Sequence, residues 1–159
     1  MPRKKLDDKF FMRWAEDVSK ASTCAKIQVG AVLVKDRRVI SLGYNGVPSN
    51  QTHCCDHFVE ALDPNILGEE EFLKQHAKFS DEHELHSEQS CIIDALKRQQ
   101  NLSDSTLYCT WSPCFACAKV ILSVGIKKVV YKNTYKQESI DFLKNYTEVL
   151  HITESIARV

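Results

Sequence analysis

Two short motifs carry residue types that bind a transition metal and move protons. The first is His86-Ser87-Glu88 and the second is Pro113-Cys114-Phe115-Ala116-Cys117. An imidazole and two thiolates supply three ligands, which leaves the fourth position of a tetrahedral zinc ion open for water. Zinc lowers the pKa of such a water to about 7, so hydroxide is available at neutral pH. The motifs therefore predict a catalytic zinc centre held by His86, Cys114 and Cys117.

Glu88 has the place of a proton carrier in this arrangement. It follows the histidine by two positions, so on a helix its side chain leaves in a different direction from the ligand. A carboxylate placed in this way takes a proton from the water and delivers it to a leaving nitrogen. His-x-Glu together with Pro-Cys-x-x-Cys is the signature of zinc deaminases. The alternative is a structural zinc site, which normally has a fourth protein ligand and no use for Glu88.

Both motifs stand at the starts of predicted helices, with a strand between them. An apolar stripe indicates a helix over 87–100, and Pro113 suits the first turn of a helix that runs to Val124 before Gly125. Further helices are expected at 6–21 and 138–144. Strands are expected at 27–34, 38–42, 106–110, 127–131 and 148–152.

The order of these elements favours an α/β fold with a mixed sheet. The first two strands are separated by a short polar connection that suits a hairpin. The later strands alternate with helices, which favours parallel pairing through right-handed crossovers. Residues 47–84 show no clean period, although about 68–78 could form a helix. So long an irregular segment suggests a functional or tethered loop.

Length and charge limit the function classes. The chain has 159 residues, which suits a single domain over 1–159. Lys and Arg number 21, as do Asp and Glu, and this balance argues against a nucleic-acid partner. No apolar stretch approaches the roughly 20 residues that span a bilayer, and no secretory signal is evident. We therefore expect a cytoplasmic protein without a membrane partner, in the host cytoplasm if the chain is phage-encoded.

Cysteine and histidine usage points to metal binding. Seven cysteines without an export signal argue against a disulfide framework. Five of the six histidines lie between His53 and His86. Cys91 and Cys109 fall at core positions of the predicted helix and strand, and we expect them to be buried thiols.

The chain resembles the zinc-dependent cytidine deaminase superfamily, and within it the bacteriophage branch of the deoxycytidylate (dCMP) deaminases. The shared segments, within residues 24–131, are Val29-Gly30-Ala31-Val32, Gly43-Tyr44-Asn45-Gly46-Val47-Pro48, Cys54-Cys55-Asp56, His86-Ser87-Glu88 and Ser112-Pro113-Cys114-x-x-Cys117-Ala118-Lys119. The usual family motif reads His-Ala-Glu, and Ser87 replaces the alanine. Serine is small and favoured near a helix start, so we expect the same chemistry.

The resemblance implies a three-layer α-β-α fold of the cytidine deaminase type, with a mixed five-stranded sheet. It implies hydrolysis of dCMP to dUMP and ammonia, which feeds dTMP synthesis. His86, Cys114 and Cys117 would hold the catalytic zinc and Glu88 would carry protons. Hydroxide would add to C4 of the cytosine before ammonia leaves.

The resemblance also implies a set of substrate-binding residues, namely Asn45, Trp111, Ser112 and Tyr135. Asn45 matches a position that contacts the deoxyribose, and Tyr135 lies where relatives have a tyrosine near the 5′-phosphate. Trp111 and Ser112 would border the base pocket. Plainer interpretations remain, with Asn45 as a turn residue, Trp111 in the core and Tyr135 as an exposed strand-end aromatic. Lys97 or Arg98 could add positive charge near the phosphate.

A second, noncatalytic zinc is implied by the phage-type relatives. The matching positions here are Cys24, Cys54, His76 and Glu84. Such an ion would hold a loop that has too little apolar content to hold itself. The competing ligands are His53, Cys55, His57 and His83. The alternative is that all of these are ordinary loop residues and that no second ion binds.

Relatives are commonly homohexamers that dCTP activates and dTTP inhibits. The resemblance implies an effector site near Gly43-Tyr44-Asn45-Gly46, where a triphosphate would bind together with Mg²⁺. A glycine turn can direct backbone N–H groups to phosphates.

Other functions share the zinc motifs. The alternatives are deamination of dCTP, of cytidine or of a base in tRNA or another nucleic acid. A noncatalytic zinc or nucleotide-sensing protein is a further alternative, against which the presence of Glu88 argues. A nucleic-acid substrate would favour a basic face with interleaved aromatic residues, which the sequence lacks.

Overall fold

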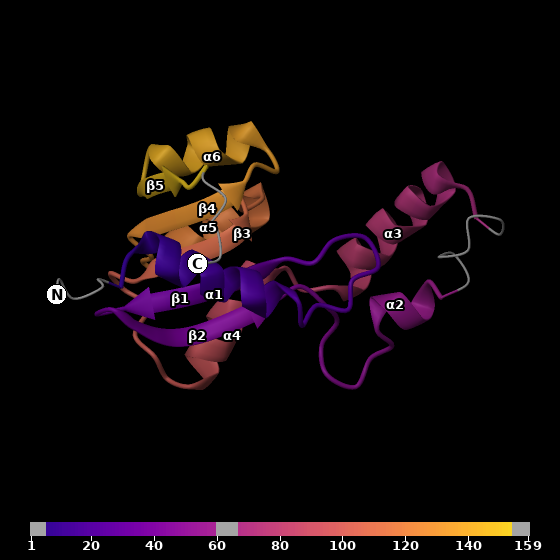
Figure 1. The fold of residues 1–159 in the computed structure, drawn as a ribbon, viewed down its shortest axis with the longest axis horizontal. Coiled ribbons are helices and arrows are strands. Elements are labelled where there is room, and N and C mark those ends of the chain that lie inside the picture. The colour runs from indigo at the N-terminus through magenta and orange to yellow at the C-terminus, as the bar shows by residue number, and fades with distance from the viewer. Residues whose placement is uncertain (1–5, 60–66, 154–159) are drawn as a thin grey trace, which may run out of the picture.

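Five strands form one mixed sheet in the computed structural model, which describes residues 6–59 and 67–153 (Figure 1). The strands are β1 (Gly30–Lys35), β2 (Arg38–Tyr44), β3 (Thr106–Trp111), β4 (Lys128–Asn133) and β5 (Glu148–His151). Their order across the sheet is β2-β1-β3-β4-β5. β1 runs antiparallel to β2 and β3, whereas β3, β4 and β5 are parallel. The predicted mixed sheet of five strands is confirmed.

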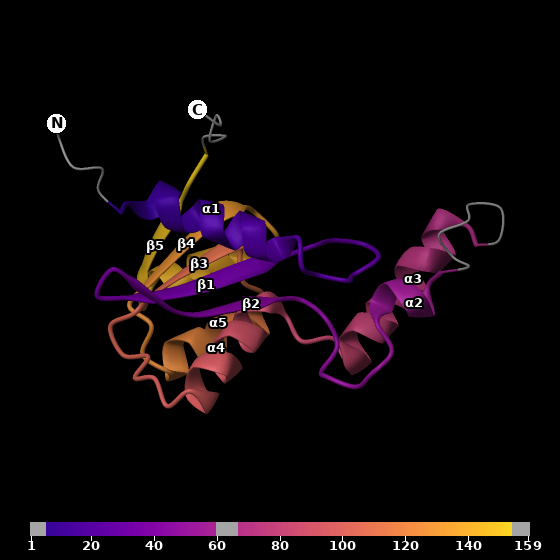
Figure 2. The same ribbon diagram turned by 60° about the horizontal axis from the view of Figure 1, so that its bottom comes forward.

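Helices cover both faces of this sheet and make three layers (Figure 2). The helix α1 (Asp8–Ser19) packs on one face against Val32, Tyr108 and Val130. The opposite face is covered by α4 (Ser87–Lys97), α5 (Phe115–Ser123) and α6 (Gln137–Lys144). Successive strand residues point to opposite faces, so Ala31 and Leu33 join this second core. The two cores together confirm the α-β-α arrangement.

The segment between β2 and α4 forms an arm that projects beyond the sheet (Figures 1 and 2). It contains α2 (Cys54–His57) and α3 (Glu69–His83). The arm has its own small aromatic core, in which the Phe58 and Phe79 rings lie 5.5 Å apart. Its apolar content is low, so sequence periodicity missed α2 and placed the end of α3 about a turn too early.

Several predicted boundaries are wrong by a few residues. β1 begins at Gly30 rather than at residue 27, and α4 ends at Lys97 rather than at residue 100. Pro113 precedes α5 instead of occupying its first turn, because Cys114 is the N-cap. This last correction matters for the site, since the cap position directs the Cys114 thiol at the helix start.

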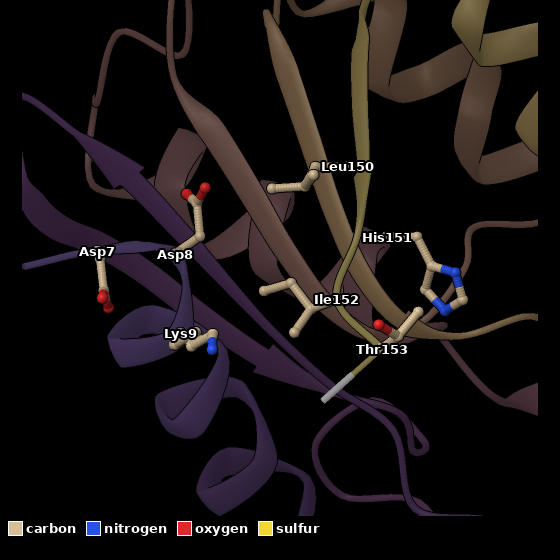
Figure 3. A pocket seen from close by; sticks show the side chains of 7 residues that line it. All are labelled: Asp7, Asp8, Lys9, Leu150, His151, Ile152 and Thr153. Carbon is tan, nitrogen blue, oxygen red and sulfur yellow. The ribbon is translucent and has the colours of Figure 1, made fainter. Parts of the chain in front are cut away.

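A hollow of about 410 Å³ lies between the start of α1 and the end of β5 (Figure 3). Asp7, Lys9 and His151 are among the residues that line it. It belongs to the α1 side of the sheet, whereas both metal-ligand motifs start helices of the other side. Across residues 6–59 and 67–153, no helix combines the length and apolar character required to cross a membrane.

Candidate active site and a second metal-ligand cluster

Two helix starts meet at the first metal-ligand cluster. His86 is the N-cap of α4 and Cys114 is the N-cap of α5. The His86 Nδ1 atom lies 3.5 Å from Cys114 Sγ and 3.4 Å from Cys117 Sγ. Usual zinc bond lengths and a tetrahedral angle separate a sulfur ligand from a nitrogen ligand by about 3.6 Å. The three side chains that the sequence predicts as ligands therefore fit one zinc ion.

Strand pairing brings the two motifs to one edge of the sheet. The Pro-Cys-x-x-Cys motif follows the carboxyl end of β3 directly. The turn after β2 emerges at the same edge, because β2 and β3 both run antiparallel to β1. There the Gly46 N–H donates to the Leu85 carbonyl at 3.1 Å, and the Leu85 N–H donates back at 2.8 Å. This bridge fixes the residue that precedes His86.

A hydrogen bond between the thiols of Cys114 and Cys117 shifts their pKa values in opposite directions. This bond, aided by His86, lowers the pKa of Cys114, whereas the same bond and burial raise the pKa of Cys117. The Cys117 N–H also donates to Cys114 Sγ at 3.5 Å. The lowered pKa favours the thiolate form of Cys114, and a bound cation would displace the thiol proton of Cys117.

Glu88 is buried in the first turn of α4, two residues after His86. Its carboxylate accepts a hydrogen bond from Ser87 Oγ at 3.0 Å. Burial raises the pKa of Glu88, while its own backbone N–H, His86 and Ser87 oppose that shift. A desolvated carboxyl group with a raised pKa can both take and return a proton near neutral pH.

A second group of ligand atoms lies where the arm joins the body of the protein. It consists of Cys24, Cys54, His76 and Glu84, whose ligand atoms all lie within 4.8 Å of one another. The Cys24 Sγ atom lies 3.2 Å from His76 Nε2 and 3.9 Å from Glu84 Oε2. The Glu84 Oε1 atom is buried without a hydrogen-bond partner among the described residues. A buried, unpartnered carboxylate oxygen is costly unless a cation binds it.

Burial favours the neutral forms of the two cysteines and the histidine in this second group. It raises the pKa of Cys24 and raises that of Cys54 to about 12, and it lowers the pKa of His76. The Ala25 N–H donates to Cys54 Sγ at 3.3 Å, as backbone amides commonly do to sulfur ligands. Two cysteines, a histidine and a carboxylate form a closed four-ligand set of the kind that structural zinc sites use.

The four competing residues are not part of either cluster. His53 Nδ1 contacts Thr23 Oγ1 at 3.2 Å, and the His57 ring stacks on Phe79 at 4.5 Å. Cys55 contacts the neighbouring Asp56, and His83 lies 3.9 Å from Glu82.

The residues expected around the substrate lie at the end of β3 and in the loops that follow β2, β3 and β4. Ser112 is buried, and its hydroxyl accepts a hydrogen bond from the Tyr135 N–H at 2.8 Å. This bond links the loop after β3 to the loop after β4. Trp111 is half-buried and the Tyr135 side chain is exposed. Asn45 is buried, and its side-chain amide holds the chain before β1 in place. It donates a hydrogen bond to the Ile27 carbonyl and accepts one from the Val29 N–H.

The glycine turn after β2 opens onto a hollow of about 350 Å³ beside α4. Its lining includes Tyr44, Gly46 and Lys97. Arg98 instead pairs with Asp94 at 3.0 Å.

The close approach of β2 to α4 was not predicted from the sequence. A Cβ atom on Gly43 would lie 2.4 Å from the Cys91 nitrogen and 2.6 Å from the Ser87 carbonyl oxygen. Ser41, two residues earlier on the same face, donates to the Cys91 carbonyl at 2.5 Å. Small residues at alternate positions of a strand indicate a close helix crossing, and this pair was the available signal. Cys91 and Cys109 are buried thiols, as predicted.

Comparison with known proteins agrees with this site. Residues 5–133 match the family described as the cytidine and deoxycytidylate deaminase zinc-binding region. The chain is 34% identical over 142 residues to the deoxycytidylate deaminase of Enterobacteria phage T4, covering 74% of this chain and 73% of that one. It is 32% identical to the dCMP deaminase of cyanophage S-TIM5, solved in complex with dCMP and dUMP. That structure aligns over 91% of this chain and 95% of its own, with a TM-score of 0.71. The chain therefore belongs to the cytidine and deoxycytidylate deaminase zinc-binding family.

Proposed function

We propose that this protein hydrolyses dCMP to dUMP and ammonia, and so feeds dTMP synthesis. The observation that carries the proposal is the junction of α4 and α5, where three zinc-type ligands meet beside a buried glutamate. Similarity to phage deoxycytidylate deaminases, and to a structure that contains dCMP and dUMP, supports the choice of substrate. Residues 1–159 would act as one catalytic domain.

In this proposal His86, Cys114 and Cys117 hold the catalytic zinc. The ion, when bound, supplies a water whose pKa is lowered to about 7. Glu88 takes a proton from the attacking water as the new C–O bond forms at C4. It then gives a proton to the amino nitrogen, and the C4–N bond breaks to release ammonia. Glu88 and Cys117 are buried, and burial strengthens electrostatic interactions at these groups.

The substrate would lie against the loops that follow β3 and β4. We assign Trp111 and Ser112 to the border of the base pocket, Tyr135 to the 5′-phosphate and Asn45 to the deoxyribose. Support comes from the Ser112–Tyr135 bond, which keeps the proposed base and phosphate contacts on one linked pair of loops. The Tyr135 side chain is exposed, and the Lys136 ammonium lies 5.4 Å from the centre of its ring, which places a positive charge beside the proposed phosphate contact.

Cys24, Cys54, His76 and Glu84 would hold a second, structural zinc. Their mutual proximity and the unpartnered Glu84 oxygen support this assignment. The ligands come from the chain before β1, from α2, and from the middle and end of α3. One ion would thus join the arm to the body of the protein.

We also propose an effector site and an oligomeric state for this protein. The hollow beside Gly43, Tyr44, Asn45 and Gly46 would receive dCTP or dTTP, with Mg²⁺ on the triphosphate. The protein would assemble as a homohexamer and act on the nucleotide pool of the cytoplasm, that of the host if the chain is phage-encoded. A hyperbolic dCMP curve that neither triphosphate shifts would remove the effector role, and sedimentation measures the oligomer.

The experiment that tests the function compares substrates on zinc-replete protein. Cytidine, dCMP and dCTP are incubated separately, and the loss of cytosine absorbance is followed. Turnover of dCMP far above the others is expected. Preference for dCTP would keep the zinc chemistry and overturn the proposed substrate. A zinc-loaded protein that turns over none of the three, with or without dCTP as activator, would overturn the proposed function.

A further inference from the structure

We propose that Ser87 is a positioning residue for the deamination, whose hydroxyl holds one oxygen of the Glu88 carboxylate and leaves the other to exchange protons. The inference rests on the proposed function, because Glu88 carries the proton in that reaction. It concerns the middle residue of the His86-Ser87-Glu88 motif. An alanine offers no donor there.

The hydrogen bond itself is shielded from water. Ser87 Oγ donates to Glu88 Oε2 at 3.0 Å, at the long end of the range for hydroxyl donors. Both side chains are buried, so water does not compete for the carboxylate oxygen at this contact. Within residues 6–59 and 67–153, this is the one hydrogen bond of the Ser87 hydroxyl. Bonds to a charged partner are stronger than neutral ones.

Helix capping does not account for the hydroxyl. Ser87 is the first residue of α4, whereas the N-cap is His86. The Gln89 side chain accepts a hydrogen bond from the His86 N–H at 2.9 Å and so helps to cap the helix. The Ser87 hydroxyl is directed to a carboxylate rather than to a backbone N–H of the first turn.

The backbone that carries Ser87 is held firmly in place. β2 packs so closely that a Cβ on Gly43 would lie 2.6 Å from the Ser87 carbonyl oxygen. One turn further on, Ser41 donates to the Cys91 carbonyl. A glutamate side chain has three rotatable torsions, and a donor fixed to this backbone restrains the last of them. Orientation held in advance lowers the barrier of a proton transfer.

The contact distinguishes the two carboxylate oxygens. Oε2 accepts the hydrogen bond from Ser87 Oγ, so it is a weaker base than Oε1. The proton taken from the attacking water therefore goes to Oε1, and the proton delivered to the leaving nitrogen comes from Oε1. The carboxylate returns to its starting charge after each turnover.

The test replaces Ser87 and compares the variant with a matched buried serine. Ser105 is equally buried, and its hydroxyl donates to the Leu102 carbonyl before β3, away from the zinc ligands. For Ser87→Ala we expect kcat for dCMP to fall about tenfold, because a donor to a buried carboxylate is lost. The KM for dCMP, the affinity for dUMP measured by calorimetry, and the zinc content should stay unchanged. Ser105→Ala should leave kcat unchanged.

A double variant separates positioning from general disruption. If Ser87 acts through Glu88, Ser87→Ala should lower the residual rate of Glu88→Gln by less than about twofold. If the wild type is active and the kcat of Ser87→Ala lies within about twofold of the wild-type value, the role of Ser87 is overturned while the proposed function stands. Equal losses of kcat in the wild-type and Glu88→Gln backgrounds would also overturn it. A wild type inactive on every cytosine nucleotide would instead overturn the proposed function.

Discussion

His86 Nδ1 lies 3.5 Å from Cys114 Sγ, although 28 positions separate the two residues and each caps a different helix. Both caps stand at the edge of the sheet where β3 ends. A zinc ion bound at this junction would tie α4 to α5, with two helix N-termini and their partial positive charge around one site. In the proposed reaction, the two helix N-termini would add to the stabilisation of developing negative charge that the ion supplies.

Removing a ligand of this centre should remove both metal and activity. Cys114→Ala leaves one thiol and one imidazole, which is too few for tight zinc binding. We expect one zinc fewer per chain and loss of dCMP turnover, measured by atomic emission and by the absorbance assay. Cys91→Ala, in a buried thiol of α4 outside the cluster, should keep the metal. Full activity of a metal-free Cys114→Ala protein would contradict the mechanism.

Glu88→Gln should separate metal binding from proton transfer. The amide keeps the shape of the side chain but cannot carry a proton. Zinc content should match the wild type, whereas kcat should fall by about 10²–10⁴-fold, the usual contribution of a general acid–base group. Substantial remaining activity would show that another group moves the proton.

The second cluster predicts that neighbouring cysteines behave differently. Cys54 belongs to the cluster, whereas Cys55 does not. The wild type should bind two zinc ions per chain, Cys54→Ala one and Cys55→Ala two. Hydrogen exchange should show that α3 loses protection only in Cys54→Ala, because few apolar contacts hold the arm. One zinc per wild-type chain together with a protected α3 would rule out the second ion.

Gly43→Ala should harm both stability and activity. The added methyl group would overlap the backbone of α4, since its Cβ falls 2.4 Å from the Cys91 nitrogen. We expect a loss of about 1–3 kcal/mol in the free energy of unfolding, as for other overpacked sites. A shift of α4 would also move Glu88 and lower kcat.

Gly68→Ala is the matched control, because nothing lies within 4 Å of a Cβ at that position. Its unfolding free energy should change by less than about 1 kcal/mol. Denaturant unfolding measures both variants, and equal effects would argue against close packing of β2 on α4.

The buried hydroxyl of Tyr108 should make the folded protein less stable at alkaline pH. Its hydroxyl donates to Asp8 Oδ1 at 2.7 Å, and burial together with Asp8 raises the pKa of Tyr108. The folded protein therefore keeps a proton that the unfolded chain loses above pH of about 10. The stabilisation is fully present below that pH and declines above it by about 1.4 kcal/mol per pH unit.

Tyr108→Phe isolates this effect from that of the buried thiols, whose raised pKa values act in the same direction. The wild type should be more stable than Tyr108→Phe by about 1 kcal/mol at neutral pH. That difference should shrink as the pH rises above about 10. A difference that stays constant from neutral to alkaline pH would contradict the assignment.

The sequence by itself determined the chemistry and the order of the elements. Cys114 and Cys117 meet through the local geometry of one helix start, so their spacing is sufficient to predict a joint metal site. Strong apolar patterns likewise predicted all five strands and the helices of the body. The arm was predicted only in part: a helix was expected at about 68–78, but α2 was missed. The reason is that α3 buries only His76 and Phe79, which leaves a weak periodic signal.

Tertiary structure decided which of eight candidate residues form the second cluster. Its contacts join residues 52 and 60 positions apart, and such contacts depend on where the arm folds back onto the body. The close approach of β2 to α4 was decided in the same way. Gly43 is tightly enclosed only because α4 crosses the strand there, and the crossing sets the positions of Ser87 and Glu88. Local propensity cannot specify such contacts, since they form only when distant segments pack together.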